Sequence, residues 1–213
     1  MYFLPEALDN YVVAHSEQEP DLLQQLTRET YQKVLQPIML SGPYQGRVLS
    51  MISKLICPKS ILELGTFTGY STLCLAEGLA DNGELHTIDI NEELVDFQRK
   101  YFDKSGFGSQ IIQHVGHALD IIPTLDKRFD LVFIDADKPN YSRYFHLIID
   151  QLNSGGIILS DNVLWHGKVI EPLDKKDVST RAVLEYNTLL KTDNRVETVV
   201  LPIRDGLTIS RKK

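Results

Sequence analysis

The sequence predicts an α/β fold in which a mostly parallel sheet of about seven strands carries helices on both faces. Two observations support this prediction. From residue 58 onward, short apolar runs alternate with helical stretches, which is the pattern of strand–helix units wound into a parallel sheet. Near the carboxyl end, only Arg204 and Asp205 separate two strand-like runs, which predicts an antiparallel hairpin at the edge of the sheet.

Residues 1–57 are expected to form helices that precede the sheet. After Pro20 and Asp21, apolar side chains recur at spacings of three and four residues, with Tyr31 in phase, at Leu22, Leu23, Leu26, Val34, Leu35 and Ile38. A second amphipathic run, 48–56, stops before Pro58. No repeat or linker-like composition interrupts the chain, so we expect one domain, 1–213, with these helices followed by an α/β core at 58–213.

The expected strands are short apolar runs, and the expected helices lie between the first five of them. The strands are SILEL (60–64), ELHTIDI (84–90), QIIQHV (110–115), DLVFID (130–135), GIILSD (156–161), VETVVLPI (196–203) and GLTISR (206–211). The helical stretches are 69–80, 92–104, 117–125 and 140–152.

Composition narrows the classes of function. Lys plus Arg number 22 against 29 acidic residues, a net charge of −7, which argues against a protein that binds nucleic acid or an anionic membrane. No apolar run is long enough to span a bilayer, and the start, MYFLPEALDN, lacks the pattern of a secretory signal. Cys57 and Cys74 lie in largely apolar surroundings and are expected to be buried free thiols, which fits a reducing, cytoplasmic setting.

A glycine turn follows the first expected strand, in the segment ELGTFTGYS at 63–71. Gly65 and Gly69 allow a tight turn and the close approach of a ligand to the backbone. Phe67 stands where the dinucleotide fingerprint requires its second glycine, which counts against NAD or FAD and against a dehydrogenase. Glu63, before the turn, suits a cationic ligand better than a phosphate.

The second strand ends near Asp89, 24 residues after Gly65, where a carboxylate can accept hydrogen bonds from both hydroxyls of a ribose. Together, the turn and the acid suggest a ligand that contains a nucleoside but no pyrophosphate, and S-adenosylmethionine (SAM) fits this description. The alternative is an ordinary strand–helix turn followed by a solvated acid.

Two further apolar strands end in an aspartate, at Asp135 and at Asp161, and Asn162 follows the second. If these strands are neighbours, their ends place two carboxylates and an amide oxygen at one point. Such a set of oxygens suits Mg²⁺, with Ca²⁺ or Mn²⁺ as other options, rather than zinc. The alternative is that these aspartates cap turns or helices, as Asp137 before Pro139 also suggests.

Lys138 lies three residues after Asp135. An ammonium beside a cation and a sulfonium is disfavoured by like charge, so this lysine could accept a proton from a phenolic hydroxyl. The more common fate of a lysine is a solvated position on the surface.

These segments together resemble the cation-dependent O-methyltransferases, the family that contains the caffeoyl-CoA and catechol O-methyltransferases. The resemblance covers nearly the whole chain and is carried, in order, by ILELGTFTGYSTL (61–73), TIDIN (87–91), DLVFIDADKPNY (130–141), GGIILSDNVLWHGKV (155–169) and LPIRDGLTISRK (201–212). It implies a Rossmann-like SAM-dependent methyltransferase fold, a divalent cation and a homodimer.

The resemblance also implies roles for individual residues. Lys138 matches the catalytic base, and the metal ligands match Asp135, Asp161 and Asn162. The positions that contact SAM match Ser41, Glu63, Gly65, Thr66, Ser71, Asp89, Ala118, Asp135 and Asp137. The positions that contact the acceptor match Trp165, His166 and Asp205.

The expected reaction is methyl transfer from SAM to an oxygen of a vicinal-dihydroxy aromatic acceptor. Three departures bear on the acceptor: His166 stands where plant relatives carry asparagine, Phe67 where catechol enzymes carry tyrosine, and Tyr44 and Gln45 where many relatives have acidic or other residues. Two alternatives stay open, a methyltransferase that needs no metal and a nucleoside-binding protein without catalysis.

Overall fold

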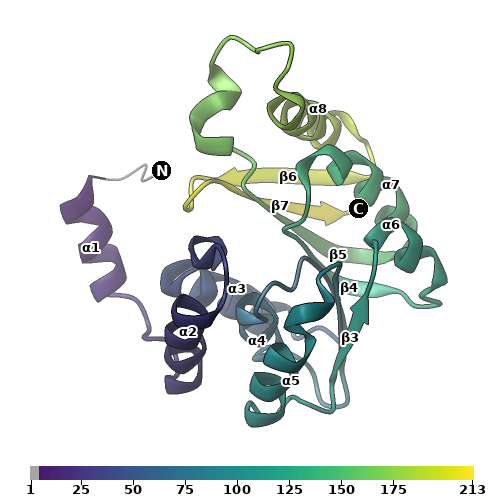
Figure 1. The fold of residues 1–213 in the computed structure, drawn as a ribbon. Coiled ribbons are helices and arrows are strands. Elements are labelled where there is room, and N and C mark those ends of the chain that lie inside the picture. The colour runs from purple at the N-terminus through teal and green to yellow at the C-terminus, as the bar shows by residue number, and fades with distance from the viewer. Residues whose placement is uncertain (1–4) are drawn as a thin grey trace.

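The computed structural model describes residues 5–213, in which seven strands form one sheet in the order β3-β2-β1-β4-β5-β7-β6 (Figure 1). Residues 1–4, part of the expected amino-terminal helical region, lie outside the described residues. The first five strands in sequence pair in parallel, whereas β7 runs antiparallel to both of its neighbours. The strands are β1 (Ser60–Leu64), β2 (Glu84–Asp89), β3 (Ile111–Val115), β4 (Phe129–Ile134), β5 (Leu152–Asp161), β6 (Val196–Leu201) and β7 (Leu207–Lys212).

Eight α-helices accompany the sheet among these residues: α1 (Glu6–Ala14), α2 (Asp21–Lys33), α3 (Pro43–Ile56), α4 (Tyr70–Ala76), α5 (Val95–Lys104), α6 (Ala118–Ile121), α7 (Tyr141–Gln151) and α8 (Val178–Thr192). Helices α2 to α5 cover one face of the sheet, and α6 to α8 lie over the other (Figure 1). The predicted α/β fold, with helices on both faces and a carboxyl-terminal antiparallel hairpin at the sheet edge, is therefore confirmed.

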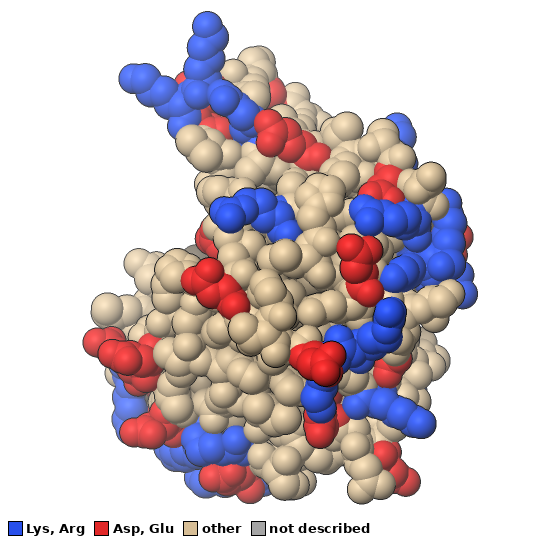
Figure 2. Space-filling view, turned by 90° about the vertical axis from the view of Figure 1, so that its right-hand side faces the viewer, with Lys and Arg blue, Asp and Glu red and all other residues tan. Residues whose placement is uncertain are grey.

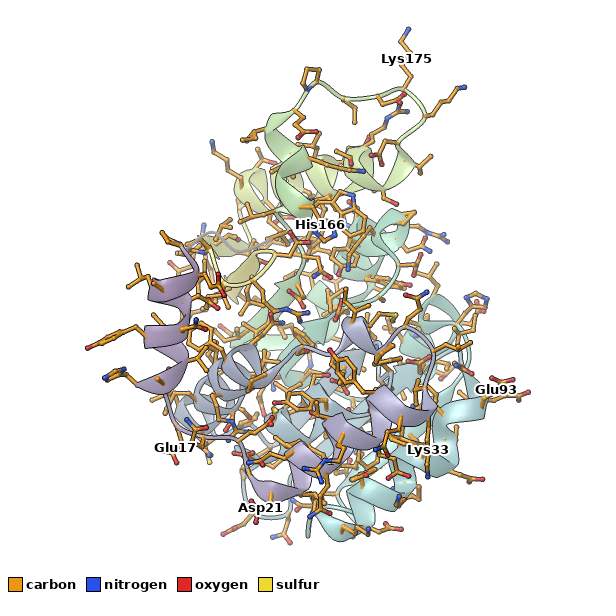
Figure 3. The ribbon with its side chains drawn as sticks, turned by 60° about the vertical axis from the view of Figure 1, so that its left-hand side comes forward. Glu17, Asp21, Lys33, Glu93, His166 and Lys175 are labelled. Atoms are coloured by element: carbon orange, nitrogen blue, oxygen red, sulfur yellow. The ribbon has the colours of Figure 1, made fainter. Side chains whose placement is uncertain are left out.

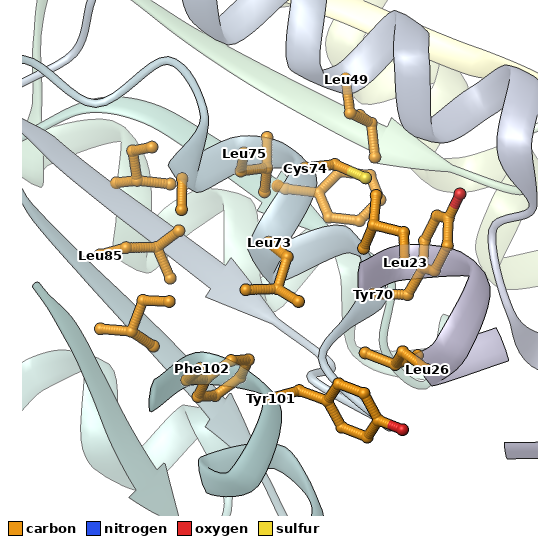
Figure 4. Close-up of a cluster of buried hydrophobic side chains, with 14 of the residues drawn as sticks. Leu23, Leu26, Leu49, Tyr70, Leu73, Cys74, Leu75, Leu85, Tyr101 and Phe102 are labelled. Carbon is orange, nitrogen blue, oxygen red and sulfur yellow. The ribbon is translucent and has the colours of Figure 1, made fainter. Parts of the chain in front are cut away.

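The alternation of side chains along β4 builds both halves of the core. Leu131 and Phe133 belong to the cluster under α2 to α5, whereas Val132 and Ile134 belong to the cluster under α7 and α8. In the first cluster, side chains from all four covering helices belong to the same group of buried residues as Leu85 of the sheet (Figure 4). A strand that is apolar on both sides has to be covered on both sides, which is why the apolar runs predict a doubly covered sheet.

The amino-terminal region departs from the predicted periodicity. Helix α2 ends at Lys33, and three side chains expected on its buried face are exposed, at 62% for Tyr31, 88% for Leu35 and 72% for Ile38. The helix stops because Val34 is extended and Gln36 adopts a left-handed conformation, with φ of 57°. Pro37 then follows, and proline lacks the N–H that a continuing helix needs.

Two other expectations need correction. Helix α8 was absent from the predicted helices, although Asp177 caps it by accepting from Thr180 N at 2.9 Å and Val183 and Tyr186 lie buried on one side. Cys74 is a buried free thiol as expected, but Cys57, the left-handed residue that follows α3, is exposed. The prediction of two buried thiols is therefore correct for Cys74 and wrong for Cys57.

The outer surface is mixed in charge. On the face shown in Figure 2, acidic and basic side chains are interspersed rather than gathered into one field. No helix among residues 5–213 combines the length and the apolar character needed to cross a membrane.

Candidate active site

The carboxyl ends of three neighbouring parallel strands meet at one edge of the sheet. Leu64 of β1 pairs in register with Ile134 of β4, and Ile134 pairs with Ser160 of β5. The residues that follow them are Gly65, Asp135 and Asp161, so the glycine turn and the two aspartates of the sequence prediction emerge side by side. The strand order reverses between β1 and β4, which is where open α/β sheets bind their ligands.

Gly65 packs against the backbone of Asp135 more closely than any other residue could. Its φ is +95°, and a Cβ built on it would lie 1.9 Å from the carbonyl oxygen of Asp135. The Asp135 N–H donates to the Leu64 carbonyl at 2.9 Å, which fixes the two segments together. Glycine is required here by contact as well as by conformation.

Glu63 lies fully buried beneath the turn and accepts only from hydroxyl groups. Ser71 donates to Oε1 at 2.6 Å and Thr87 to Oε2 at 2.6 Å, and Thr72 also donates to Oε2. Burial raises the pKa of Glu63 to about 7, with the negative charge of Asp135 acting in the same direction and the hydroxyl donors opposing it. This carboxylate anchors the start of α4, and Ser71 is part of the same contact.

Asp89 ends β2 and holds the tip of the glycine turn. Its Oδ2 accepts from Phe67 N at 2.7 Å and its Oδ1 from Asn91 N at 2.9 Å. Each carboxylate oxygen can accept more than one hydrogen bond, so a ribose diol remains a chemically suitable partner. Phe67 itself has a φ of 48°, a left-handed conformation that Gln98 supports by donating to its carbonyl at 2.7 Å.

Asp161 and Asp135 form the acidic part of the site. Asp161 is 1% exposed, and its Oδ1 accepts from Asn162 N at 2.7 Å while its Oδ2 accepts from Gln45 Nε2 at 2.7 Å. Burial, followed by the negative charge of Asp135, raises the pKa of Asp161 to about 7. The side chain of Asp135 is 26% exposed and accepts from Lys138 Nζ at 3.3 Å.

Lys138 is buried, at 7% exposure, and so is not the solvated surface residue of the alternative interpretation. Its Nζ donates to Tyr141 Oη at 2.6 Å and to the Ala136 carbonyl at 3.1 Å, besides its contact with Asp135. Three acceptors match the three N–H groups of an ammonium. Tyr141 donates onward to the Asp161 carbonyl at 3.1 Å, and burial raises its pKa well above the ordinary value.

Trp165, His166 and Asp205 lie together, with the ring centres of Trp165 and His166 5.6 Å apart. The His166 N–H donates to Asp205 Oδ1 at 2.6 Å, and His166 Nδ1 lies 3.6 Å from Asp205 Oδ2. The Trp165 ring centre is 5.7 Å from Lys138 Nζ. Figure 3 shows His166 beneath the projecting segment that carries Lys175. Of the three residues predicted to contact the acceptor, Trp165 therefore adjoins the predicted base, and His166 and Asp205 contact each other.

The remaining predicted residues lie around this centre. Thr66 is buried and shares a hydrogen bond of 2.6 Å with Thr87 Oγ1, which ties it to the Glu63 contacts. Ser41 is buried just before α3, and Ala118 begins α6. Asp137 precedes Pro139 at a helix start as expected, but its side chain accepts from Asn140 Nδ2 at 2.6 Å and from Tyr144 instead of capping the backbone.

Three residues at the site were not predicted. Gln45 binds the Asp161 carboxylate, Tyr141 joins Lys138 to the end of β5, and the positive charge of Arg204 acts on Asp161. Tyr141 lies three residues after Lys138 and so shares a helical face with it, a spacing that could have identified it. Gln45 is 116 residues from Asp161, and no local pattern connects the two.

The carboxylates of Asp135 and Asp161 are suitable ligands for a divalent cation. Two carboxylates lie close enough for the charge of one to raise the pKa of the other, which a bound cation would relieve. Across residues 5–213, no three carboxylate, thiol or imidazole side chains gather as metal ligands, so a third protein ligand would come from another group, such as the side-chain amide of Asn162. Carboxylate and amide oxygens without sulfur are a donor set for Mg²⁺, Ca²⁺ or Mn²⁺.

Comparison with known proteins identifies the family. The family model described as O-methyltransferase matches residues 13–213. Caffeoyl-CoA O-methyltransferase 5 of Nicotiana tabacum is 36% identical over 220 residues, covering 97% of this chain and 91% of the relative. The caffeoyl-CoA O-methyltransferase of Eucalyptus gunnii is 37% identical over 219 residues, covering 97% and 88% of the two chains.

Solved structures agree with this result. The O-methyltransferase TomG of Streptomyces achromogenes, involved in tomaymycin synthesis and solved in complex with SAM, has a TM-score of 0.88 at 29% identity, covering 97% of this chain and 96% of that one. The O-methyltransferase of Bacillus cereus in complex with SAH has a TM-score of 0.89 at 28% identity, covering 97% of each chain. The resemblance inferred from the motifs is confirmed, and the chain belongs to the O-methyltransferase family.

Proposed function

We propose that this protein is a SAM-dependent O-methyltransferase that requires a divalent cation and acts on a vicinal-dihydroxy aromatic acceptor of the catechol type. The products are the methyl ether and S-adenosylhomocysteine (SAH). The observation that carries the proposal is the meeting of the glycine turn at Gly65 with Asp135, Asp161 and Lys138 at one edge of the sheet. A methyl donor bound at the glycine turn would lie next to the carboxylates of Asp135 and Asp161 and the amine of Lys138.

The SAM side of the proposal rests on the turn and on Asp89. The turn leaves the backbone at Gly65 without a side chain, and Asp89 supplies a carboxylate at the end of the adjacent strand. TomG and the B. cereus enzyme, which share this fold, were solved with SAM and SAH. Glu63, Thr66 and Ser71 support the turn from below, and Ser41, Ala118 and Asp137 are proposed as further contacts with the cofactor.

The residues that would hold the cation are Asp135, Asp161 and Asn162, with Mg²⁺ the proposed ion and Ca²⁺ or Mn²⁺ the other options. When bound, the cation would act as a Lewis acid toward the acceptor and favour its phenolate form, which matters because a free phenol has a pKa near 10.

The side chains of the chain itself have two tasks in this reaction. As a neutral amine, Lys138 receives the proton of the attacking hydroxyl. A neutral amine has two N–H groups and one lone pair, so one of its three present hydrogen bonds has to give way to the substrate. Trp165, His166 and Asp205 cover the acceptor and hold its oxygen in line with the methyl group and the sulfonium sulfur. The C–S bond of SAM breaks as the O–CH₃ bond forms, and the electron pair stays on sulfur as SAH leaves.

The proposed acceptor class is tested by comparing matched phenols. With SAM and Mg²⁺, catechol and caffeic acid are expected to be methylated, whereas phenol and guaiacol, which lack a free vicinal pair, are not. The measurement is transfer of label from methyl-labelled SAM, with the product identified by mass spectrometry. Equal rates on catechol and phenol would contradict chelation by a vicinal diol, and binding of SAM without transfer to any acceptor would favour a non-catalytic protein.

We further propose a cytoplasmic homodimer whose subunit is one domain. Large apolar side chains are exposed between α2 and α3 and on α3, at Leu35, Ile38, Met39, Met51 and Leu55. Exposed apolar surface of this kind is typical of interaction sites, which supports a second copy as the partner.

A further inference from the structure

Gln45 lies in the first turn of α3, in a part of the chain that precedes the whole sheet. Its side chain is buried, at 1% exposure, and reaches the end of β5. A glutamine is seldom buried so completely unless its polar atoms have a specific partner. The partner of its amide nitrogen is the Asp161 carboxylate.

The hydrogen bond from Gln45 helps to fix the orientation of the Asp161 carboxylate. Gln45 Nε2 donates to Oδ2 at 2.7 Å, while Asn162 N donates to Oδ1 at 2.7 Å. With a donor on each oxygen, rotation of the carboxylate about its bond to Cβ would break one of the two hydrogen bonds. A carboxylate offers about four lone-pair positions, so the two donors leave one on each oxygen for a further ligand.

A role in packing alone does not account for this side chain. A methionine would fill the same length without placing an amide in a dry environment, and buried amides without full partners are costly. Gln45 Oε1 is itself buried with no hydrogen-bond partner among the described residues. Burial of the Gln45 amide therefore costs free energy, and its one hydrogen bond is made to the Asp161 carboxylate.

We propose that Gln45 is a positioning residue for the divalent cation, acting through Asp161. This inference rests on the proposed function, because it takes Asp161 to be a cation ligand. Outer partners that orient a metal-binding carboxylate commonly influence metal affinity as strongly as they influence activity. It also makes α3 part of the cation site, since the contact spans 116 residues of sequence.

The test measures cation affinity directly, with Mn²⁺ as the probe and electron paramagnetic resonance of the free ion as the readout, in the presence of SAH. Gln45→Met is expected to weaken Mn²⁺ binding by roughly 10- to 100-fold while leaving the affinity for SAH unchanged. Asp161→Asn is expected to abolish Mn²⁺ binding. Thermal melting of each variant shows whether it folds, and methionine keeps the length of the side chain.

Gln151→Met is the matched control. Gln151 donates from Nε2 to the carbonyls of Ile122 and Leu125, and its Oε1 is also buried without a partner among the described residues, but its contacts lie outside the site. The Gln151→Met variant is expected to have a lower melting temperature than the wild type and an unchanged affinity for Mn²⁺. Equal Mn²⁺ affinity in wild type and Gln45→Met would overturn the role of Gln45 alone, whereas no Mn²⁺ binding by the wild type would overturn the proposed cation requirement as well.

Discussion

Replacing Lys138 by methionine is expected to lower kcat for methyl transfer by about 10²- to 10⁴-fold, the range that a positioned general base contributes. Methionine keeps the length and the apolar stem but removes the amine that contacts Tyr141, Asp135 and the Ala136 carbonyl. The amine is the group proposed to receive the phenolic proton, and Lys138 is not among the residues proposed to contact SAM. The loss should therefore appear in kcat, while the affinity for SAM stays unchanged.

The measurement is steady-state kinetics with catechol at saturating SAM, together with titration of SAH into the free enzyme. Lys104→Met is a suitable control because Lys104 is exposed on α5, far along the chain from the acidic residues. Unchanged turnover would remove Lys138 as the base.

Replacing Gly65 by alanine is expected to lower the free energy of unfolding by at least about 3 kcal/mol and to impair SAM binding. The new Cβ would lie 1.9 Å from the Asp135 carbonyl oxygen, which belongs to backbone and cannot swing aside. The strain at φ of +95° adds to this clash. Either the turn or the segment at Asp135 has to move.

Gly106→Ala separates the two causes. Gly106 also has a positive φ, of +83°, but a Cβ built on it meets nothing within 4 Å. It is expected to cost only about 1–2 kcal/mol from backbone strain. Chemical denaturation of both variants and titration with SAH give the comparison, and similar losses in the two would show that the contact between Gly65 and Asp135 is unimportant.

Much of the fold could be predicted because its physical causes are local. Each buried strand is a short apolar run, and each lies near a glycine, proline or charged residue that ends it. The amino-terminal region was harder, since Leu35 and Ile38 continue the periodicity of α2 although the chain leaves the helix at Val34 and Gln36. The spacing of apolar residues does not reveal that a single residue adopts a left-handed backbone conformation.

The site was predictable to the extent that it lies at strand ends. Asp135 and Asp161 each follow an apolar run, and the parallel pairing of β4 with β5 brings them together. Gln45 could not be found in this way, because its contact with Asp161 depends on how α3 packs across the finished sheet. The burial of Lys138 likewise emerges only from the packing of α7 and α8, whereas the spacing of Tyr141 could have indicated its contact with Lys138.

The most direct test of the central proposal is the dependence of catechol methylation on a divalent cation. The protein is treated with EDTA, the chelator is removed, and transfer from labelled SAM to catechol is measured before and after Mg²⁺ is returned, with SAH binding measured in parallel. We expect activity to be lost on chelation and restored by Mg²⁺, while SAH binds throughout. Full activity of the EDTA-treated protein before Mg²⁺ is returned would contradict the proposal and would favour a methyltransferase that needs no metal.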